Sequence, residues 1–147
     1  MAEATTNQLR VRLVTPEKTL FESYADAVEL PAKSGYMEVL YGHAPLLSEL
    51  GAGDVTIHGA SDETPEDPTR YNVNWGFVEV LPDRVTILAN DALKPQEIDV
   101  QRAGQQLDRG VEQWKHAGES EEAYDEALRI ISEAEAKLAS AGANHHP

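Results

Sequence analysis

His43 is the side chain of this sequence best suited to acid–base chemistry, and carboxylates flank it at Glu38 and Glu49. A small enzyme built on these residues would need both carboxylates within hydrogen-bond reach of the imidazole in one pocket. Side chains along a strand alternate between its two faces, which argues against such a cluster. Ser48 lacks the flanking glycines of a Gly-x-Ser-x-Gly nucleophile elbow. We therefore predict no catalytic residue and interpret His43 as a loop side chain.

Asp99 and Arg102 form a second charged group, three residues apart at the start of a predicted helix. An aspartate there suits the positive end of the helix, and the i, i+3 ion pair adds about 0.2–0.5 kcal/mol. These effects explain the pair without a ligand. His145 and His146 are adjacent, and two neighbouring imidazoles cannot both bind one metal with good geometry. We predict no metal site, and the absence of cysteine excludes disulfides and thiolate chemistry.

The composition limits the partners of this chain. Its 147 residues carry 26 acidic and 12 basic side chains, a net charge of −14. Such a chain repels phosphate backbones, so we expect no nucleic-acid partner. The N-terminal residues lack the apolar core of a signal peptide, and no apolar run approaches the roughly 20 residues that span a bilayer. Any membrane association is therefore expected to come through partner proteins.

Strand patterns fill the first part of the sequence, which we assign to an antiparallel β-sandwich domain over residues 1–90. Leu9, Val11 and Leu13 alternate with Arg10 and Arg12, as in a strand with one buried face. Turn residues recur at roughly the 8–12-residue spacing of a sandwich or barrel. The predicted strands lie near residues 8–14, 19–30, 36–40, 46–50, 54–58, 70–75, 76–81 and 84–89.

A stiff corner is predicted between two of these strands. Pro45 fixes its own φ and extends the residue before it, whereas Gly42 can adopt a positive φ. We expect this corner to hold His43 outward and to bury Leu46 and Leu47. A rigid loop mounted on a sheet is suited to contact with another surface.

Helical periodicity replaces the strand pattern after a linker over residues 91–97. It predicts an antiparallel two-helix hairpin over residues 98–141 and a flexible tail over residues 142–147. Ser120 is the predicted N-cap of the second helix and Gly142 its stop, and Gly104 and Gly110 each cost the first helix about 1 kcal/mol relative to alanine. The two apolar stripes are Val100, Ala103, Leu107, Val111 and Trp114, then Tyr124, Ala127, Leu128, Ile131, Ala134 and Leu138.

Three segments carry a resemblance to a known family. Residues 42–47 read Gly-His-Ala-Pro-Leu-Leu. Residues 76–80 read Gly-Phe-Val-Glu-Val, with Val-Thr-Ile-Leu-Ala at 85–89, and residues 98–103 read Ile-Asp-Val-Gln-Arg-Ala. In this order and spacing they resemble the epsilon subunit of the F-type ATP synthase over most of the chain. One departure is Glu38, which stands where the family usually has glycine.

The resemblance implies a non-catalytic central-stalk subunit of the rotor. It would couple the catalytic head to the membrane rotor ring in proton-driven ATP synthesis, at the cytoplasmic face of the bacterial inner membrane. It would require no cofactor, and the reaction would belong to the whole complex. The resemblance also implies that a loop contacts the gamma subunit and the rotor ring subunits through Tyr41, Gly42, His43, Ala44 and Pro45.

Some members of this family bind one regulatory ATP through an Ile/Leu-Asp-x-x-Arg-Ala signature, which is matched here by Ile98, Asp99, Arg102 and Ala103. Those members add arginines from the second helix, where this sequence has Glu133, Glu135 and Lys137. One cation beside two acids makes a poor triphosphate site. ATP is therefore a candidate regulatory ligand, and a free-standing ATP-sensing binding module is the alternative function.

The second predicted helix also departs from the family in charge. Residues 121–137 contain six acids and two bases. In the family this helix is basic and meets an acidic segment of the catalytic beta subunit, which blocks hydrolysis. Because like charges repel, we hypothesise that inhibition by this arm is weak here or uses another surface.

Overall fold

The computed structural model describes residues 7–61 and 66–144, and the chain divides between Ala92 and Leu93 into two compact units. Residues 91–93, which the sequence pattern assigns to a linker, continue the last strand, and residues 95–97 form a short 3-10 helix. The strand continues past residue 90 because Ala92 still packs against the apolar core. His145 and His146 lie outside the described residues.

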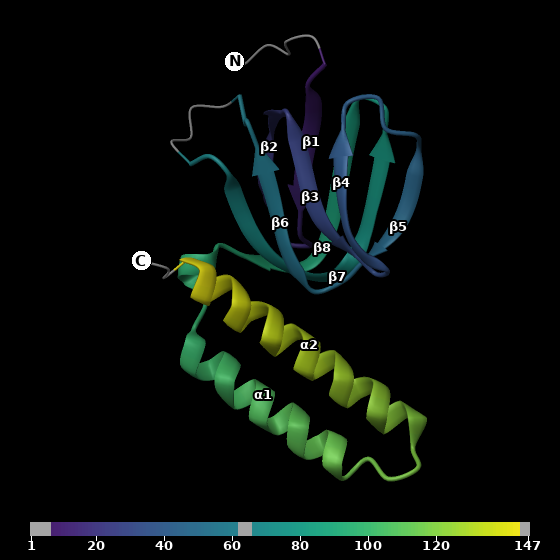
Figure 1. The fold of residues 1–147 in the computed structure, drawn as a ribbon, viewed down its shortest axis with the longest axis vertical. Coiled ribbons are helices and arrows are strands. Elements are labelled where there is room, and N and C mark those ends of the chain that lie inside the picture. Colours follow the sequence, from purple (N-terminus) through teal and green to yellow (C-terminus); the bar gives the residue numbers. More distant parts are fainter. Residues whose placement is uncertain (1–6, 62–65, 145–147) are drawn as a thin grey trace. The chain divides into compact units, whose positions relative to one another are not determined.

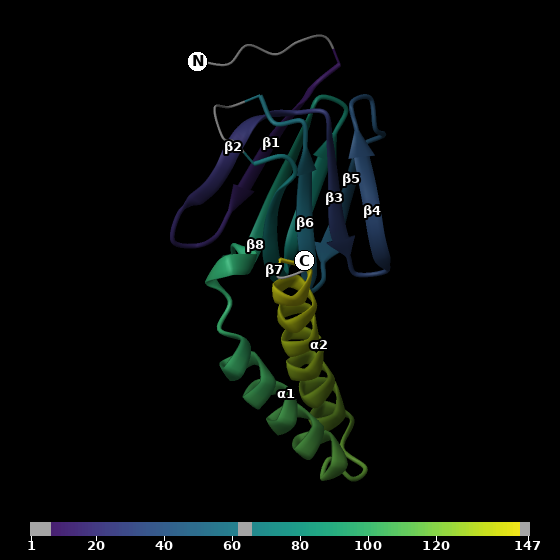
Figure 2. The same cartoon turned by 60° about the vertical axis from the view of Figure 1, so that its left-hand side comes forward.

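The first unit is a two-layered β-sandwich (Figures 1 and 2). Its strands follow the order β2-β1-β8-β7-β5-β3-β4, with β6 paired to β3 and β7. The predicted sandwich is confirmed, although β1 and β8 run parallel, and the other pairs with a recorded register are antiparallel. The strands are β1 (Leu9–Val14), β2 (Thr19–Ala25), β3 (Ala27–Ala32), β4 (Gly35–Leu40), β5 (Leu46–Leu50), β6 (Gly53–His58), β7 (Thr69–Leu81) and β8 (Arg84–Leu93).

Alternation places the core of the sandwich between its layers. Leu9, Val11 and Leu13 are fully buried, whereas Arg10 and Arg12 point to solvent. Each fully buried branched side chain stabilises the fold by about 1.5–3 kcal/mol. The other strands add buried residues with the same period, among them Val28, Leu30, Val39, Val55, Ile57, Val73, Val78, Val80, Val85 and Ile87.

Two predicted strand boundaries are wrong. The strand predicted over residues 19–30 is divided at Asp26, whose backbone N–H donates to the carbonyl oxygen of His58 (2.9 Å). The two strands predicted over residues 70–75 and 76–81 are one strand, β7, which bends at Trp75 (φ 50°) and Gly76 (φ 130°). The bend lies where β7 changes its partner from β6 to β5.

The second unit is a helical hairpin, as predicted, formed by η1 (Pro95–Glu97), α1 (Val100–Lys115) and α2 (Glu121–Asn144). The hydroxyl of Ser120 accepts a hydrogen bond from the Ala123 N–H (3.2 Å), which confirms the predicted N-cap. The predicted stop at Gly142 is wrong because α2 continues to Asn144. A glycine ends a helix by adopting a positive φ, as Gly118 does between the helices (φ 63°), and Gly142 does not. Among the residues described, no helix is both long and apolar enough to cross a bilayer.

Small residues fill the contact between the two helices. Ala103, Gly110, Ala127 and Ala134 are buried. The stripes predicted from the sequence are partly wrong, because four of their large members are exposed: Val100, Trp114, Tyr124 and Leu128. The backbones approach closely at Gly110, where an added Cβ would lie 3.3 Å from the backbone nitrogen of Ile131. Trp114 and Tyr124 still pack edge to face, with ring centroids 6.0 Å apart.

Candidate partner-binding face

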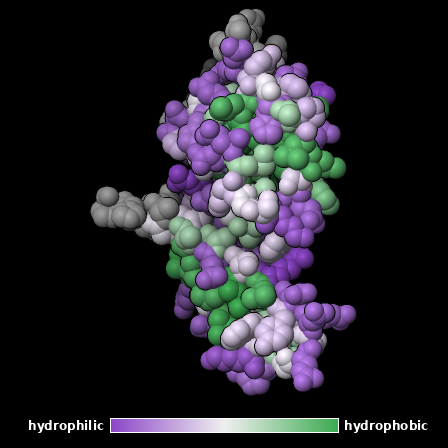
Figure 3. Space-filling view, turned by 45° about the vertical axis from the view of Figure 1, so that its right-hand side comes forward, coloured by the Kyte–Doolittle hydropathy of each residue, from purple (hydrophilic) through white to green (hydrophobic). Residues whose placement is uncertain are grey.

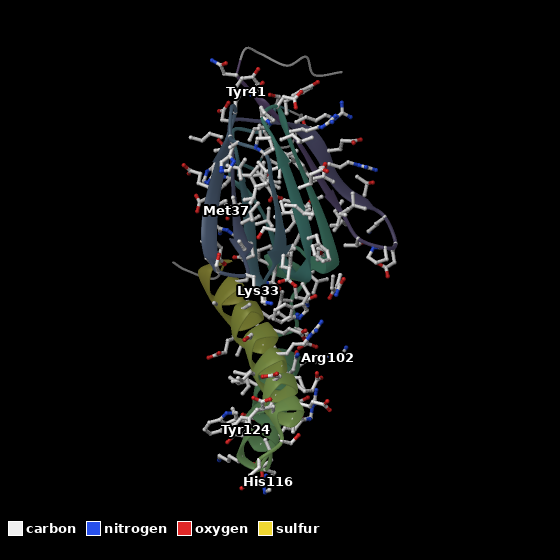
Figure 4. All side chains as sticks on the ribbon, turned by 90° about the vertical axis from the view of Figure 1, so that its right-hand side faces the viewer. Lys33, Met37, Tyr41, Arg102, His116 and Tyr124 are labelled. Carbon is white, nitrogen blue, oxygen red and sulfur yellow. The ribbon has the colours of Figure 1, made fainter. Side chains whose placement is uncertain are left out.

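The loop between β4 and β5, residues 41–45, lies at one end of the sandwich. In Figure 4 its residue Tyr41 marks this end and Lys33 marks the opposite one. The Gly42 N–H donates to the Pro82 carbonyl oxygen in the β7–β8 turn (2.7 Å), and the His43 N–H donates to the carbonyl oxygen of Leu40 (3.1 Å). Gly42 has a φ of 90°, which favours glycine. The loop is therefore tied both to its own strand and to a neighbouring turn.

His43 is half-buried within this loop, and its ring contacts the backbone of the loop itself. Its ring Nδ1 lies 2.7 Å from the carbonyl oxygen of Ala44. Because a carbonyl can only accept, Nδ1 carries the proton in this arrangement. The ring thus stabilises the corner, which explains a histidine here without any catalytic role.

The carboxylates that flank His43 in the sequence lie beside other residues in the structure. Glu49 forms an ion pair with Lys33 (Nζ to Oε2, 3.0 Å). Glu38 lies on β4 opposite Glu29 of β3. The pocket that an acid–base enzyme would require is therefore not formed around His43.

Leu46 and Leu47 differ from expectation, because they are 40 % and 70 % exposed rather than buried. The start of β5 has a neighbouring strand on one side only. β5 pairs with β7 along its whole length, but it meets β3 only where Leu50 lies opposite Ala32. The two leucines are consequently left open to solvent, next to the loop that precedes them.

Further apolar side chains continue this exposed surface across the outer face of β1, β8, β7 and β5. Leu88 lies opposite Val14. Counting back from the turn at residues 82–83 sets Phe77 opposite Leu88, and Leu47 lies diagonally beside Phe77. Phe77 is 51 % exposed and Leu88 is 49 % exposed. We call this set the outer apolar patch: Val14, Leu47, Phe77 and Leu88.

The side of the sandwich that carries β4 and β5 also exposes apolar groups. Tyr36, Leu40 and Tyr41 are all exposed there, and Figure 3 shows apolar residues at the surface among hydrophilic ones. Contiguous exposed apolar surface marks sites of protein–protein contact. The arrangement of loop and patch can therefore bind another protein.

The sequence reasoning missed the outer apolar patch, although a signal was present. Phe77 and Leu88 are out of phase with Val78 and Ile87, which are fully buried in the core. Apolar residues in both phases of a strand indicate that both faces become covered. Residues 76–81 and 84–89 carry this signal.

In the helical unit, the residues of the nucleotide signature lie at the start of α1. Ile98 and Ala103 are buried. Asp99 is the N-cap of α1, and its carboxylate accepts a hydrogen bond from the Arg102 backbone N–H (3.0 Å). The Arg102 side chain (Figure 4) is exposed and borders an open depression of about 400 Å³, which is lined by Asp99, Gln101, Arg102, Gln105 and Arg109.

A carboxylate of the second helix takes part in the contact between the helices. Glu133 accepts a hydrogen bond from Gln106 Nε2 (3.2 Å), and Arg129 Nε lies 3.7 Å from its other oxygen. A negative charge held against α1 repels phosphate groups. The other acids of α2 line its exposed surface, at Glu121, Glu122, Asp125, Glu126 and Glu135.

Comparison with known proteins agrees with a β-sandwich followed by a helical hairpin. Residues 8–95 match the family model described as ATP synthase, Delta/Epsilon chain, beta-sandwich domain. The ATP synthase epsilon chain of Koribacter versatilis is 41 % identical over 107 residues, which cover 72 % of this chain and 71 % of that one. The ATP synthase epsilon chain of Solibacter usitatus is 38 % identical over 133 residues, which cover 90 % of this chain and 95 % of that one. This protein belongs to the ATP synthase epsilon chain family, as its motifs predict.

Solved structures share the fold. A chain of the Euglena gracilis mitochondrial ATP synthase superposes with a TM-score of 0.75 and 18 % identity, covering 94 % of this chain and 84 % of that one. A chain from the central stalk and c-ring of the Tetrahymena thermophila mitochondrial ATP synthase gives a TM-score of 0.66 and 14 % identity, covering 94 % and 99 %. At this identity the comparison establishes the fold alone.

Proposed function

We propose that this chain is the central-stalk epsilon subunit of a bacterial F-type ATP synthase. It couples the catalytic head to the membrane rotor ring and contributes no catalytic residue to ATP synthesis. The observation that supports this role best is the outer apolar patch, which adjoins an anchored loop and needs a covering partner. The chain is then a peripheral component at the cytoplasmic face of the inner membrane, and the gamma and rotor ring subunits are its partners.

Replacing Phe77 by aspartate is expected to prevent this assembly. Burial of a phenylalanine contributes about 1.5–3 kcal/mol, and a carboxylate buried in its place costs more. Co-purification from native membranes through a tag on the chain should recover the alpha, beta and gamma subunits with the unmodified protein. With Phe77→Asp the recovery should fall at least about tenfold.

Thr56→Asp is the matched control, because Thr56 lies on the outer face of the other layer, between Glu29 and Arg70. It adds the same charge outside the patch and should leave recovery unchanged. Equal recovery with the two variants would show that Phe77 is not covered by a partner. Absence of the other subunits from the unmodified preparation would contradict the assignment itself.

We propose further that the helical arm inhibits ATP hydrolysis only weakly. The exposed surface of α2 is acidic, so it repels an acidic segment of a catalytic subunit. Removal of residues 94–147 should change the hydrolysis rate of the reconstituted complex by less than about twofold. The cut follows Leu93 because an earlier one would shorten β8. A rise of tenfold or more would contradict the proposal.

The alternative function, an ATP-sensing module, rests on Arg102 and Arg109 beside an open depression. It has less support because the Asp99 carboxylate already caps α1, and Glu133 lies at the contact between the helices. Calorimetric titration of ATP into the intact chain distinguishes the two. Saturable heat at millimolar ATP would favour a nucleotide sensor. Its absence would exclude the ATP-sensing function.

A further inference from the structure

Three arginines gather on the outer face of β1 and β8. Parallel pairing sets Arg10 opposite Arg84 and Arg12 opposite Thr86. Arg10 and Arg12 alternate with buried residues of β1, and Arg84 directly precedes buried Val85, so all three point outward. We call Arg10, Arg12 and Arg84 the arginine cluster.

The cluster is unusual for a chain of this charge. Residues 1–92 contain fifteen acidic residues and only six basic ones, which are Arg10, Arg12, Lys18, Lys33, Arg70 and Arg84. Half of the basic residues in this range therefore lie at one place on the sheet. Arginine stays charged at any physiological pH and forms bidentate pairs with carboxylates. Its concentration here points to recognition of negative charge.

The carboxylates nearby leave part of this positive charge unmatched. Glu22 forms ion pairs with two arginines: its Oε2 lies 3.4 Å from Arg10 Nη2 and 3.3 Å from Arg12 Nε. The hydrogen bond that the Arg10 guanidinium donates to the Glu22 carboxylate raises the pKa of Arg10. No ion pair is recorded for Arg84 with any residue that the structure describes. The cluster borders an open depression of about 320 Å³, which is lined also by Glu22, Glu79, Val85 and Thr86.

The arginine cluster is continuous with the candidate partner-binding face. The Arg10 N–H donates to the Asp83 carbonyl oxygen (3.0 Å), in the same turn whose Pro82 carbonyl holds Gly42 of the loop. On the other side, Arg12 is followed two residues later by Val14 of the outer apolar patch. A small anion would need only the arginines. An apolar area with a basic margin instead matches a protein surface that is apolar at its centre and acidic at its edge.

We propose that the arginine cluster binds a carboxylate-rich segment of the partner subunit that covers the outer apolar patch. The inference rests on the proposed function and adds the chemistry of the partner. Charged contacts at the margin of an interface act mainly on the association rate and on its salt dependence, whereas the apolar centre acts on affinity.

The test compares Arg84→Glu with Lys18→Glu, a matched charge reversal in the exposed β1–β2 turn. Neither side chain has a recorded ion pair within the described residues, so neither reversal breaks one. Each full-length variant is bound to an immobilised synthase complex that lacks this chain, at low and at high salt. Arg84→Glu should reduce the association rate about tenfold at low salt and much less at high salt, where screening is strong. Lys18→Glu should stay within about twofold of the unmodified chain.

The outcomes separate this inference from the proposed function. If Phe77→Asp abolishes binding while Arg84→Glu behaves as Lys18→Glu does, the arginine cluster is not a contact and only this inference fails. If the unmodified chain does not bind the complex, both fail. Saturable binding of inorganic phosphate or of anionic lipid vesicles that depends on Arg84 would assign another ligand and overturn the inference. Arg84→Gln and the thermal melting of each variant exclude loss of folding as the cause.

Discussion

Replacing Gly76 by alanine is expected to destabilise the sandwich by about 2–6 kcal/mol, the sum of backbone strain and a steric conflict. Gly76 has a φ of 130°, where residues with a side chain are strained. An added Cβ would also overlap the carbonyl oxygen of Leu88. That oxygen belongs to the backbone of β8, so relief would require the separation of two core strands.

Denaturant unfolding of the full chain measures this effect through the fluorescence of Trp75, in a Trp114→Phe background that removes the signal of the helical unit. Gly35→Ala is the matched control. Gly35 has nearly the same φ (133°), but no atom lies within 4 Å of its added Cβ. The Gly35→Ala variant should lose only about 1–3 kcal/mol of stability, which is the contribution of backbone strain. Equal losses of stability in the two variants would show that the close approach of β7 to β8 adds nothing to the cost of the Gly76 substitution.

Replacing Gly110 by alanine is expected to weaken the helical hairpin, whereas the same change at Gly104 should strengthen it. Alanine raises helix propensity by about 1 kcal/mol at either position. At Gly104 no atom lies within 4 Å of the new Cβ. At Gly110 it would lie 2.9 Å from Ile131 Cγ1 and 3.0 Å from Ile130 Cγ2, and overpacking of this kind costs about 1–3 kcal/mol.

Hydrogen exchange of the α1 and α2 amides in the intact chain resolves this pair of variants. Gly104→Ala should slow exchange, and Gly110→Ala should accelerate it in both helices. Slower exchange in Gly110→Ala would mean that propensity outweighs the packing of the two isoleucines. From the sequence alone the two glycines are equivalent, since propensity depends only on the local chain.

The difference between local sequence and tertiary contact also separates the strands that were predicted correctly from those that were not. Alternation along residues 9–14 and 84–89 identified buried side chains, because the period of two is a property of the strand itself. β7 was divided in two because glycine at position 76 resembles a turn signal. Pairing with β6 on one half and β5 on the other, beside β8, keeps this strand continuous.

At the candidate site, too, the sequence predicted local structure but not the contacts between distant residues. The motif at residues 42–47 predicted an ordered corner, and the backbone confirms it. Its contacts with Pro82, the exposure of Leu47 and the opposition of Arg10 and Arg84 depend on residues distant in the sequence.

The sequence by itself determined the sandwich, the hairpin, the acidic balance and the family, since these depend on composition, on local periodicity and on motifs of adjacent residues. The tertiary structure alone decided which apolar side chains remain uncovered, which glycine is needed for packing and which arginines come together. The physical reason is that strand pairing and helix contact join residues far apart in the chain, and the geometry at each contact, rather than the residue type, determines what is buried.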